Sequence, residues 1–111
     1  MKNDRKKSAV GFAMKAGRCK SGAFAAKKAL TEGKARLILL DPGVSNETQK
    51  KWREGCAFLG IPLMPMEGLG LAIGKPDHMV AAITDDGFTA MLLSEREKES
   101  ISKDEMIDRT E

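Results

Sequence analysis

The sequence has 111 residues, enough for one domain, and 41% of them are hydrophobic, which suffices for one modest core. No segment approaches the roughly 20 continuous apolar residues of a transmembrane helix, and the charged, interrupted N-terminal segment lacks the pattern of a secretory signal. We therefore expect a monomeric protein of the cytoplasm with no membrane contact.

Positive charge is concentrated in the first third of the chain. Residues 1–36 contain eleven Lys and Arg against two acidic residues, a net charge of +9, whereas residues 37–111 carry a net charge of −6. A one-sided basic segment is typical of a protein that binds a polyanion such as nucleic acid. A lysine-rich solvated surface would have the same composition, so charge alone leaves both interpretations open.

Two helices are predicted in this basic third. Apolar residues at helical spacing predict an amphipathic helix over residues 6–16. Residues 19–20 are too few to assign beyond a brief extended link. Ser21 is a candidate N-cap for an alanine-rich second helix over residues 23–30.

The middle of the chain contains the clearest strand and the clearest helix. A continuous apolar run over residues 35–40 lacks alternation and predicts a strand covered on both faces. Ser45, with Glu47 in the first turn, predicts the start of a helix that ends at Gly60. We interpret Trp52, on the predicted inner face of this helix, as a core anchor rather than a base-stacking platform.

Four shorter elements are predicted next. Residues 61–64 form a strand whose proline indicates an edge or strand-start position, and residues 69–73 form a short helix between glycines. Residues 79–84 form another buried strand, and residues 85–93 form a last helix. The alternation of helices and strands predicts an α/β fold, a three-layer α/β/α sandwich with a mixed central sheet of about four strands.

The composition changes abruptly at Ser94. Eleven of the last 18 residues are charged. We interpret residues 94–111 as a frayed helix or disordered tail, and residues 1–93 as the folded domain.

Patterns typical of catalysis and metal binding are weak. His78 lies in a predicted loop, and no nucleophile-elbow motif accompanies it. Asp85 and Asp86 stand at a predicted helix start, where capping is their expected role. Cys19 and Cys56 are far apart and lack a CxxC spacing, so we interpret them as buried apolar residues. We expect no catalytic activity, no metal site and no cofactor.

The run GLGLAIG, from Gly68 to Gly74, loosely resembles a dinucleotide-binding fingerprint, with Asp85 after the next strand. Against that interpretation, the third glycine is one position late and the strands are too few for two nucleotide-binding halves. Close packing of a short helix on the sheet is the favoured interpretation. Nucleotide binding at this run is kept as an alternative.

Several segments together resemble the kink-turn-binding ribosomal-protein superfamily of the L7Ae and L30e type. GRCKSG at residues 17–22 and KALTEGKARLILL at residues 28–40 resemble its opening. LGLAIGK at residues 69–75 and AITDDGF at residues 82–88 are most similar to the bacterial YlxQ-like branch. The resemblance covers roughly residues 8–93. It implies the same three-layer sandwich and a ribonucleoprotein component that binds structured, kink-turn-like RNA, with ribosome association as a further expectation.

The resemblance also implies where RNA would bind. In the family, the start of the second helix carries Gly-Thr-Asn-Glu followed three residues later by Lys, and the loop before the last strand is the second contact. Here Gly22 and Lys28 match the glycine and the lysine. The polar triplet that hydrogen-bonds purine edges is replaced by Ala23, Phe24 and Ala25, which cannot make those bonds.

The same position keeps features that suit phosphate. A helix N-terminus presents free amides and a positive dipole end, Gly22 permits close backbone approach, and nearby lysines add charge. Phe24 could stack on an unpaired base or be buried in the core, and the sequence leaves both open. The expected RNA-binding residues are Lys20, Ser21, Gly22, Ala23, Phe24, Lys27, Lys28, Lys75, Pro76 and Asp77.

One more alternative stays open. The chain could be a protein-interaction module that keeps this fold and has lost RNA binding.

Overall fold

The computed structural model describes residues 2–94. Residues 95–111, which are all but the first residue of the predicted tail, lie outside the described residues. The elements are α1 (Lys2–Lys15), β1 (Cys19–Ser21), α2 (Ala23–Thr31), β2 (Leu37–Leu40), α3 (Asn46–Leu59), β3 (Leu63–Pro65), α4 (Leu69–Ala72) and β4 (Val80–Ile83). Residues 86–94 form a further helical segment.

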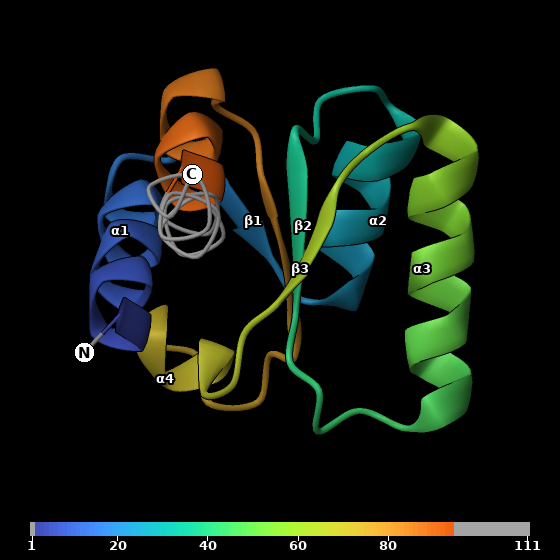
Figure 1. Ribbon diagram of the computed structural model, residues 1–111, viewed down its shortest axis with the longest axis horizontal. Coiled ribbons are helices and arrows are strands. Elements are labelled where there is room, and N and C mark those ends of the chain that lie inside the picture. Colours follow the sequence, from blue (N-terminus) through green and yellow to red (C-terminus); the bar gives the residue numbers. More distant parts are fainter. Residues whose placement is uncertain (1, 95–111) are drawn as a thin grey trace, which may run out of the picture.

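The strands form one mixed four-stranded sheet in the order β1-β4-β2-β3. β2 and β3 are parallel, whereas β4 runs antiparallel to both β1 and β2. In Figure 1, α1, α4 and the helix over residues 86–94 cover one face of the sheet, and α2 and α3 cover the other. The predicted three-layer α/β/α sandwich is confirmed. β3 is an edge strand as expected, but it begins two residues later than predicted, so Pro62 precedes it and Pro65 ends it.

The sheet separates two hydrophobic clusters. Every residue of the two central strands, β2 and β4, is buried. Alternate side chains point to opposite faces, so Leu37 and Leu39 join the cluster under α1, whereas Ile38 and Leu40 join the cluster under α2 and α3. The non-alternating apolar run therefore does mark a strand buried on both faces.

The start of the chain differs from the prediction in two places. α1 begins at Lys2 rather than near residue 6. Residues 19–20 belong to a real strand, β1, which pairs with β4 through Cys19–Ile83 and Ser21–Ala81. A three-residue strand is too short to show periodicity, so only its partner strand reveals it.

Ser21 is not the N-cap of α2, which corrects the sequence prediction. It ends β1, and Gly22 occupies the N-cap position without a side-chain capping hydrogen bond. The antiparallel pairing with β4 extends one residue further than local sequence signals indicate, and it claims Ser21 for the sheet.

The other predicted caps are confirmed. The Ser45 hydroxyl accepts a hydrogen bond from the Thr48 amide at 3.1 Å, and Gly60 ends α3 with a left-handed φ of 71°. The Asp85 carboxylate accepts a 2.8 Å bond from the Phe88 amide. These contacts fix where α3 and the last helix begin and end.

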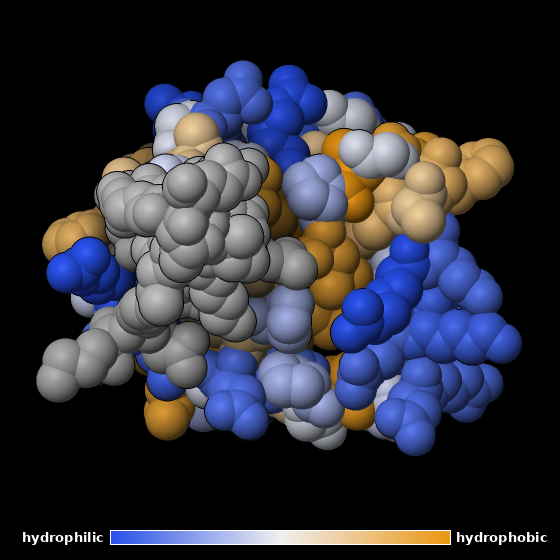
Figure 2. Space-filling view, viewed as in Figure 1, coloured by the Kyte–Doolittle hydropathy of each residue, from blue (hydrophilic) through white to orange (hydrophobic). Residues whose placement is uncertain are grey.

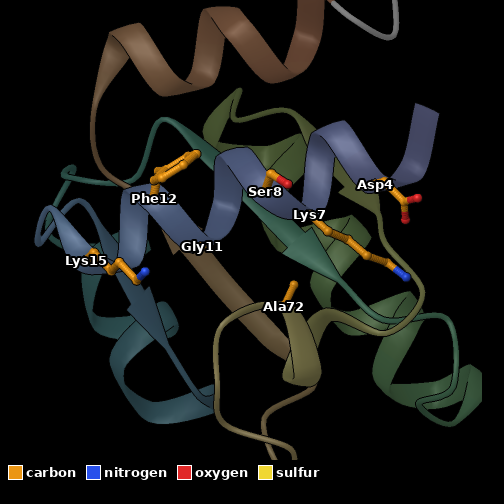
Figure 3. Close-up of a pocket in the computed structure, with 7 residues that line it drawn as sticks. All are labelled: Asp4, Lys7, Ser8, Gly11, Phe12, Lys15 and Ala72. Atoms are coloured by element: carbon orange, nitrogen blue, oxygen red, sulfur yellow. The ribbon is translucent and has the colours of Figure 1, made fainter. Parts of the chain in front are cut away.

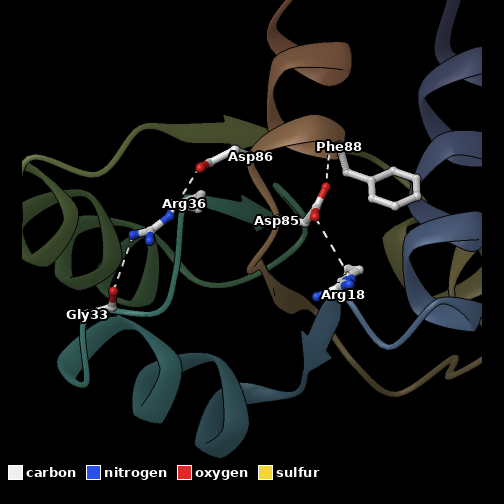
Figure 4. Close-up of polar contacts among 6 residues, drawn as sticks. All are labelled: Arg18, Gly33, Arg36, Asp85, Asp86 and Phe88. Carbon is white, nitrogen blue, oxygen red and sulfur yellow. Dashed lines mark hydrogen bonds and ion pairs between the residues drawn. The ribbon is translucent and has the colours of Figure 1, made fainter.

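Two ion pairs connect the start of the last helix to the sheet (Figure 4). Arg18 lies 3.9 Å from Asp85, and Arg36 lies 3.1 Å from Asp86. Arg36 also donates a 3.3 Å hydrogen bond to the Gly33 carbonyl. Asp85 therefore caps the last helix, as its position indicated, whereas Asp86 makes an ion pair and no capping bond is found for it among the described residues.

Trp52 is half-buried and packs against the cluster under α2 and α3, so the prediction of a largely buried core anchor is only partly met. Leu59, the last residue of α3, is exposed.

Both cysteines are buried and free, as expected. Burial raises the pKa of the Cys19 thiol to about 11, despite the opposing effect of Lys20. Burial likewise raises the pKa of the Cys56 thiol. Both thiols are therefore protonated at neutral pH, which is the state of small apolar core residues.

Among residues 2–94, no helix combines the length and the apolarity needed to cross a bilayer.

Candidate functional site

The two segments singled out by the sequence meet at one end of the sheet. The start of α2 follows β1 directly, and the loop over residues 75–79 leads into β4. The Gly22 amide donates a 2.8 Å hydrogen bond to the Val80 carbonyl. Ser21 Oγ and His78 Nδ1, 57 residues apart in the sequence, are hydrogen-bonded at 2.8 Å. The helix start and the loop therefore form one continuous surface.

Gly22 has two reasons to be glycine. Its φ of 93° lies in the region that side chains rarely adopt. A Cβ atom there would also lie 3.2 Å from His78 Cε1. The backbone at the start of α2 is consequently bare, and the described chain provides no side chain to cap it. First-turn amides without an intrahelical partner can then donate hydrogen bonds to an outside acceptor, such as a phosphate oxygen.

The loop is held from its other side by α4. Lys75, Pro76 and Asp77 are exposed, and the His78 amide donates a 2.8 Å hydrogen bond to the Lys75 carbonyl. A Cβ atom on Gly70 would lie only 2.7 Å from the Lys75 carbonyl oxygen and 2.8 Å from that of Pro76. The loop is therefore fixed between α4 and β1.

This contact explains Gly70 as a packing glycine, whereas Gly68 and Gly74 have positive φ angles of 73° and 74° at the two ends of α4. α4 has only four residues, and Gly68 is its N-cap. The Gly68 amide donates a 3.1 Å hydrogen bond to an Asp41 carboxylate oxygen. The amide before this helix is therefore already hydrogen-bonded to a carboxylate and is not free to bind a pyrophosphate. The structure therefore favours the packing interpretation over the nucleotide alternative.

Gly70→Ala should lower the free energy of unfolding by about 1–3 kcal/mol, because its methyl group would overlap the loop backbone. The matched control is Gly55→Ala in α3, where a Cβ would meet nothing within 4 Å. That change should raise the free energy of unfolding by about 0.5–1 kcal/mol. Urea denaturation measures both. Unchanged stability of Gly70→Ala, together with loss of NAD binding present in the unmodified protein, would instead support the nucleotide alternative.

The expected RNA-binding lysines at the start of α2 and on β1 line two different hollows. Lys20 and Lys28 line one hollow beside α2. Lys27, turned roughly 100° around the helix, lines the groove between α2 and α3 together with Lys51. Lys27 therefore lines a different groove from Lys20 and Lys28. Among the described residues, no ion pair involves Lys20, Lys27 or Lys28.

The replaced triplet faces solvent. Phe24 is 82% exposed, Ala23 is exposed and Ala25 is half-buried. The core interpretation of Phe24 is therefore excluded. The Phe24 ring is therefore exposed to solvent, in the segment to which the resemblance assigns the base contacts.

A different hollow, of about 470 Å³, lies between α1 and α4 (Figure 3). Its lining includes Asp4, Lys7 and Lys15 from α1, and Ala72 from α4. None of the sequence-predicted site residues contributes to it. Within residues 2–94, no three His, Cys, Asp or Glu side chains are grouped so that they could hold a metal ion.

His78 and Gly70 are the site residues that sequence reasoning did not assign. His78 follows the predicted loop immediately, but only the pairing of β1 with β4 brings it to Ser21. Gly70 was noticed as part of a glycine run, and only the folded loop shows what it packs against.

The chain is similar to one protein family and to a curated relative. The family model "Ribosomal protein L7Ae/L30e/S12e/Gadd45 family" matches residues 4–93. A curated relative, "RNA-binding protein YlxQ" from Bacillus subtilis (strain 168), is 34% identical over 88 residues, which are 77% of this chain and 88% of the relative.

Two solved structures share the fold. A protein of unknown function from Bacillus halodurans has a TM-score of 0.76 and 29% identity, covering 81% of this chain and 94% of its own. The Giardia lamblia 15.5kD RNA binding protein has a TM-score of 0.72 and 22% identity, covering 88% of each chain. At that identity the second likeness concerns the fold alone.

Proposed function

The chain belongs to the ribosomal protein L7Ae/L30e/S12e/Gadd45 family, and from this membership we propose that it is a small RNA-binding protein without catalytic activity. The proposed ligand is structured RNA of the kink-turn type. The proposed contact surface consists of the start of α2 and the loop over residues 75–77. We further propose that it is a monomeric component of ribonucleoprotein particles in the cytoplasm, where free cysteines persist.

One observation carries this proposal. The Ser21–His78 hydrogen bond joins the two segments that contact RNA in the family, although 57 residues separate them in the sequence. A bare helix start beside exposed Lys20, Lys28 and Lys75 can place phosphates by amides and charge together. The relative named as an RNA-binding protein, at 34% identity, supports the same assignment.

The site also has a predictable weakness. Ala23, Phe24 and Ala25 offer no side-chain donor or acceptor to a base edge. Phosphate contacts fix position and orientation but do not distinguish one sequence from another. We therefore propose binding that depends strongly on salt and discriminates little between related RNA structures.

A titration tests the proposal directly. The protein is titrated into a labelled kink-turn RNA and into a variant whose sheared pairs are replaced by Watson–Crick pairs, each at 50 and at about 200 mM salt. We expect binding to both RNAs, a clear loss of affinity at the higher salt, and a modest preference for the intact kink-turn. Absence of binding to either RNA at low salt would contradict the proposal.

One observation favours the second candidate, a protein-interaction module. Phe58 is 89% exposed and Leu59 is 47% exposed, and both line an apolar groove of about 380 Å³ between α2 and α3 with Trp52. Figure 2 shows hydrophobic surface where the C-terminal end of α3 lies in Figure 1. Such a patch is typical of a protein contact. The titration separates the candidates, because this module would bind neither RNA.

A further inference from the structure

The hollow beside α2 combines an exposed ring with open space. It measures about 340 Å³, at the small end of the range of about 300–1,000 Å³ for ligand pockets. Phe24 forms part of its wall, and Ala25 and Ala29 contribute short side chains from the same helix. Because alanine fills so little space, the hollow beside the ring stays open.

The position of Phe24 is costly unless something covers it. Phe24 is 82% exposed, so the ring gains almost nothing from hydrophobic burial in the free protein. Lys28 lies four residues further along α2, which places it on the same helix face as the ring. Lys20 reaches the hollow from β1, and Thr84 lines it from the segment after β4.

The charges at the rim indicate an anionic occupant. Lys20 and Lys28 take part in no ion pair with a described residue. The hollow's acidic residue, Glu32, lies 3.4 Å from Lys34, so its charge is already balanced. A ring flanked by two lysines suits a ligand that is flat, aromatic and negatively charged, rather than an apolar peptide segment.

We propose that this hollow takes one unpaired nucleotide of the bound RNA, with its base stacked on Phe24 and its flanking phosphates near Lys20 and Lys28. A base inside a duplex is stacked on both faces, so only a bulged, looped or splayed nucleotide can reach the ring. The inference rests on the proposed function, because the nucleotide belongs to the RNA. It adds a stacking contact at the position where the family's polar triplet reads paired purines.

The test uses two hairpin RNAs that differ only in one bulged 2-aminopurine, which is unpaired in one RNA and paired with uridine in the other. Affinity is measured for the unmodified protein, Phe24→Ala, Phe24→Tyr and the control Phe58→Ala. The control removes an equally exposed phenylalanine that lies in the other groove. Circular dichroism checks that each variant folds.

We expect the unmodified protein to prefer the bulged RNA roughly tenfold, in line with typical base–aromatic stacking. Its binding should also quench the 2-aminopurine fluorescence of that RNA. Phe24→Ala should abolish the preference and the quenching while still binding both RNAs, whereas Phe24→Tyr and Phe58→Ala should behave like the unmodified protein.

Three results would overturn the inference. Equal binding to both RNAs without quenching would refute the stacking contact and leave the proposed function standing. Binding to neither RNA at low salt would refute the proposed function and this inference with it. Saturable micromolar binding of free AMP, lost in Phe24→Ala, would show a pocket for a free nucleotide instead of a subsite for RNA.

Discussion

Lys28→Glu should weaken RNA binding about tenfold or more and reduce the slope of log affinity against log salt by about one. Lys28 lies on α2 beside the open hollow, and no ion pair engages it among the described residues. Its ammonium group is therefore available to displace a counterion from phosphate, and a carboxylate in its place would repel phosphate. Titrations at four or more salt concentrations measure both quantities.

The matched control is Lys50→Glu, which makes the same charge reversal at an exposed position of α3. It changes the net charge equally, so it removes any general electrostatic effect from the comparison. We expect at most a twofold loss of affinity, because steering by net charge is weak beyond the Debye length of about 10 Å at 0.1 M salt. Equal effects of the two substitutions would mean that Lys28 makes no local contact with RNA.

Restoring the polar triplet, with Ala23→Thr, Phe24→Asn and Ala25→Glu together, should raise discrimination between intact and mutated kink-turns tenfold or more. Side chains that satisfy base edges create selectivity because an RNA lacking those edges leaves the side chains unpaired, at about 1–3 kcal/mol per group. Parallel titrations of the two RNAs measure the ratio of the affinities.

The structure indicates that this variant will fold. Ala23 and Phe24 are exposed, and Ala25 is half-buried, so no fully buried side chain is replaced. With Gly22 as the N-cap, residue 25 is the third position of α2, where glutamate is favourable. The variant should also lose the preference for an unpaired nucleotide, because Phe24 is gone.

The unmodified protein sets the reference for this experiment. If it already binds the kink-turn with strong selectivity, readout must come from another segment, such as the loop over residues 75–78. Triplet restoration that leaves discrimination unchanged would likewise show that the start of α2 does not face the sheared pairs.

Much of the fold can be predicted from local sequence. The unbroken apolar runs at residues 37–40 and 80–83 indicate strands buried on both faces, and both prove to be central strands. Ser45, Gly60 and Asp85 mark helix ends through hydrogen bonds and backbone conformations that involve only neighbouring residues. Such signals need no tertiary context, because the groups that interact lie within one turn of each other.

The candidate site depends far more on tertiary structure. The local sequence predicted Ser21 to be a helix N-cap, but the pairing of β1 with β4 places Ser21 in the sheet and beside His78. The sequence could not decide whether Phe24 lies in the core or in solvent, because an alanine-rich helix shows little hydrophobic periodicity. Only the packing of α2 on the sheet shows that the ring is exposed. Lys27 and Lys28 are neighbours in the sequence but line different grooves. By itself, then, the sequence determined the layers, the two ends of α3, the start of the last helix and the basic third, because these follow from local periodicity, capping and composition. Only tertiary structure decided where β1 ends and α2 begins, and which residues share a surface, because both depend on contacts between segments far apart in the chain.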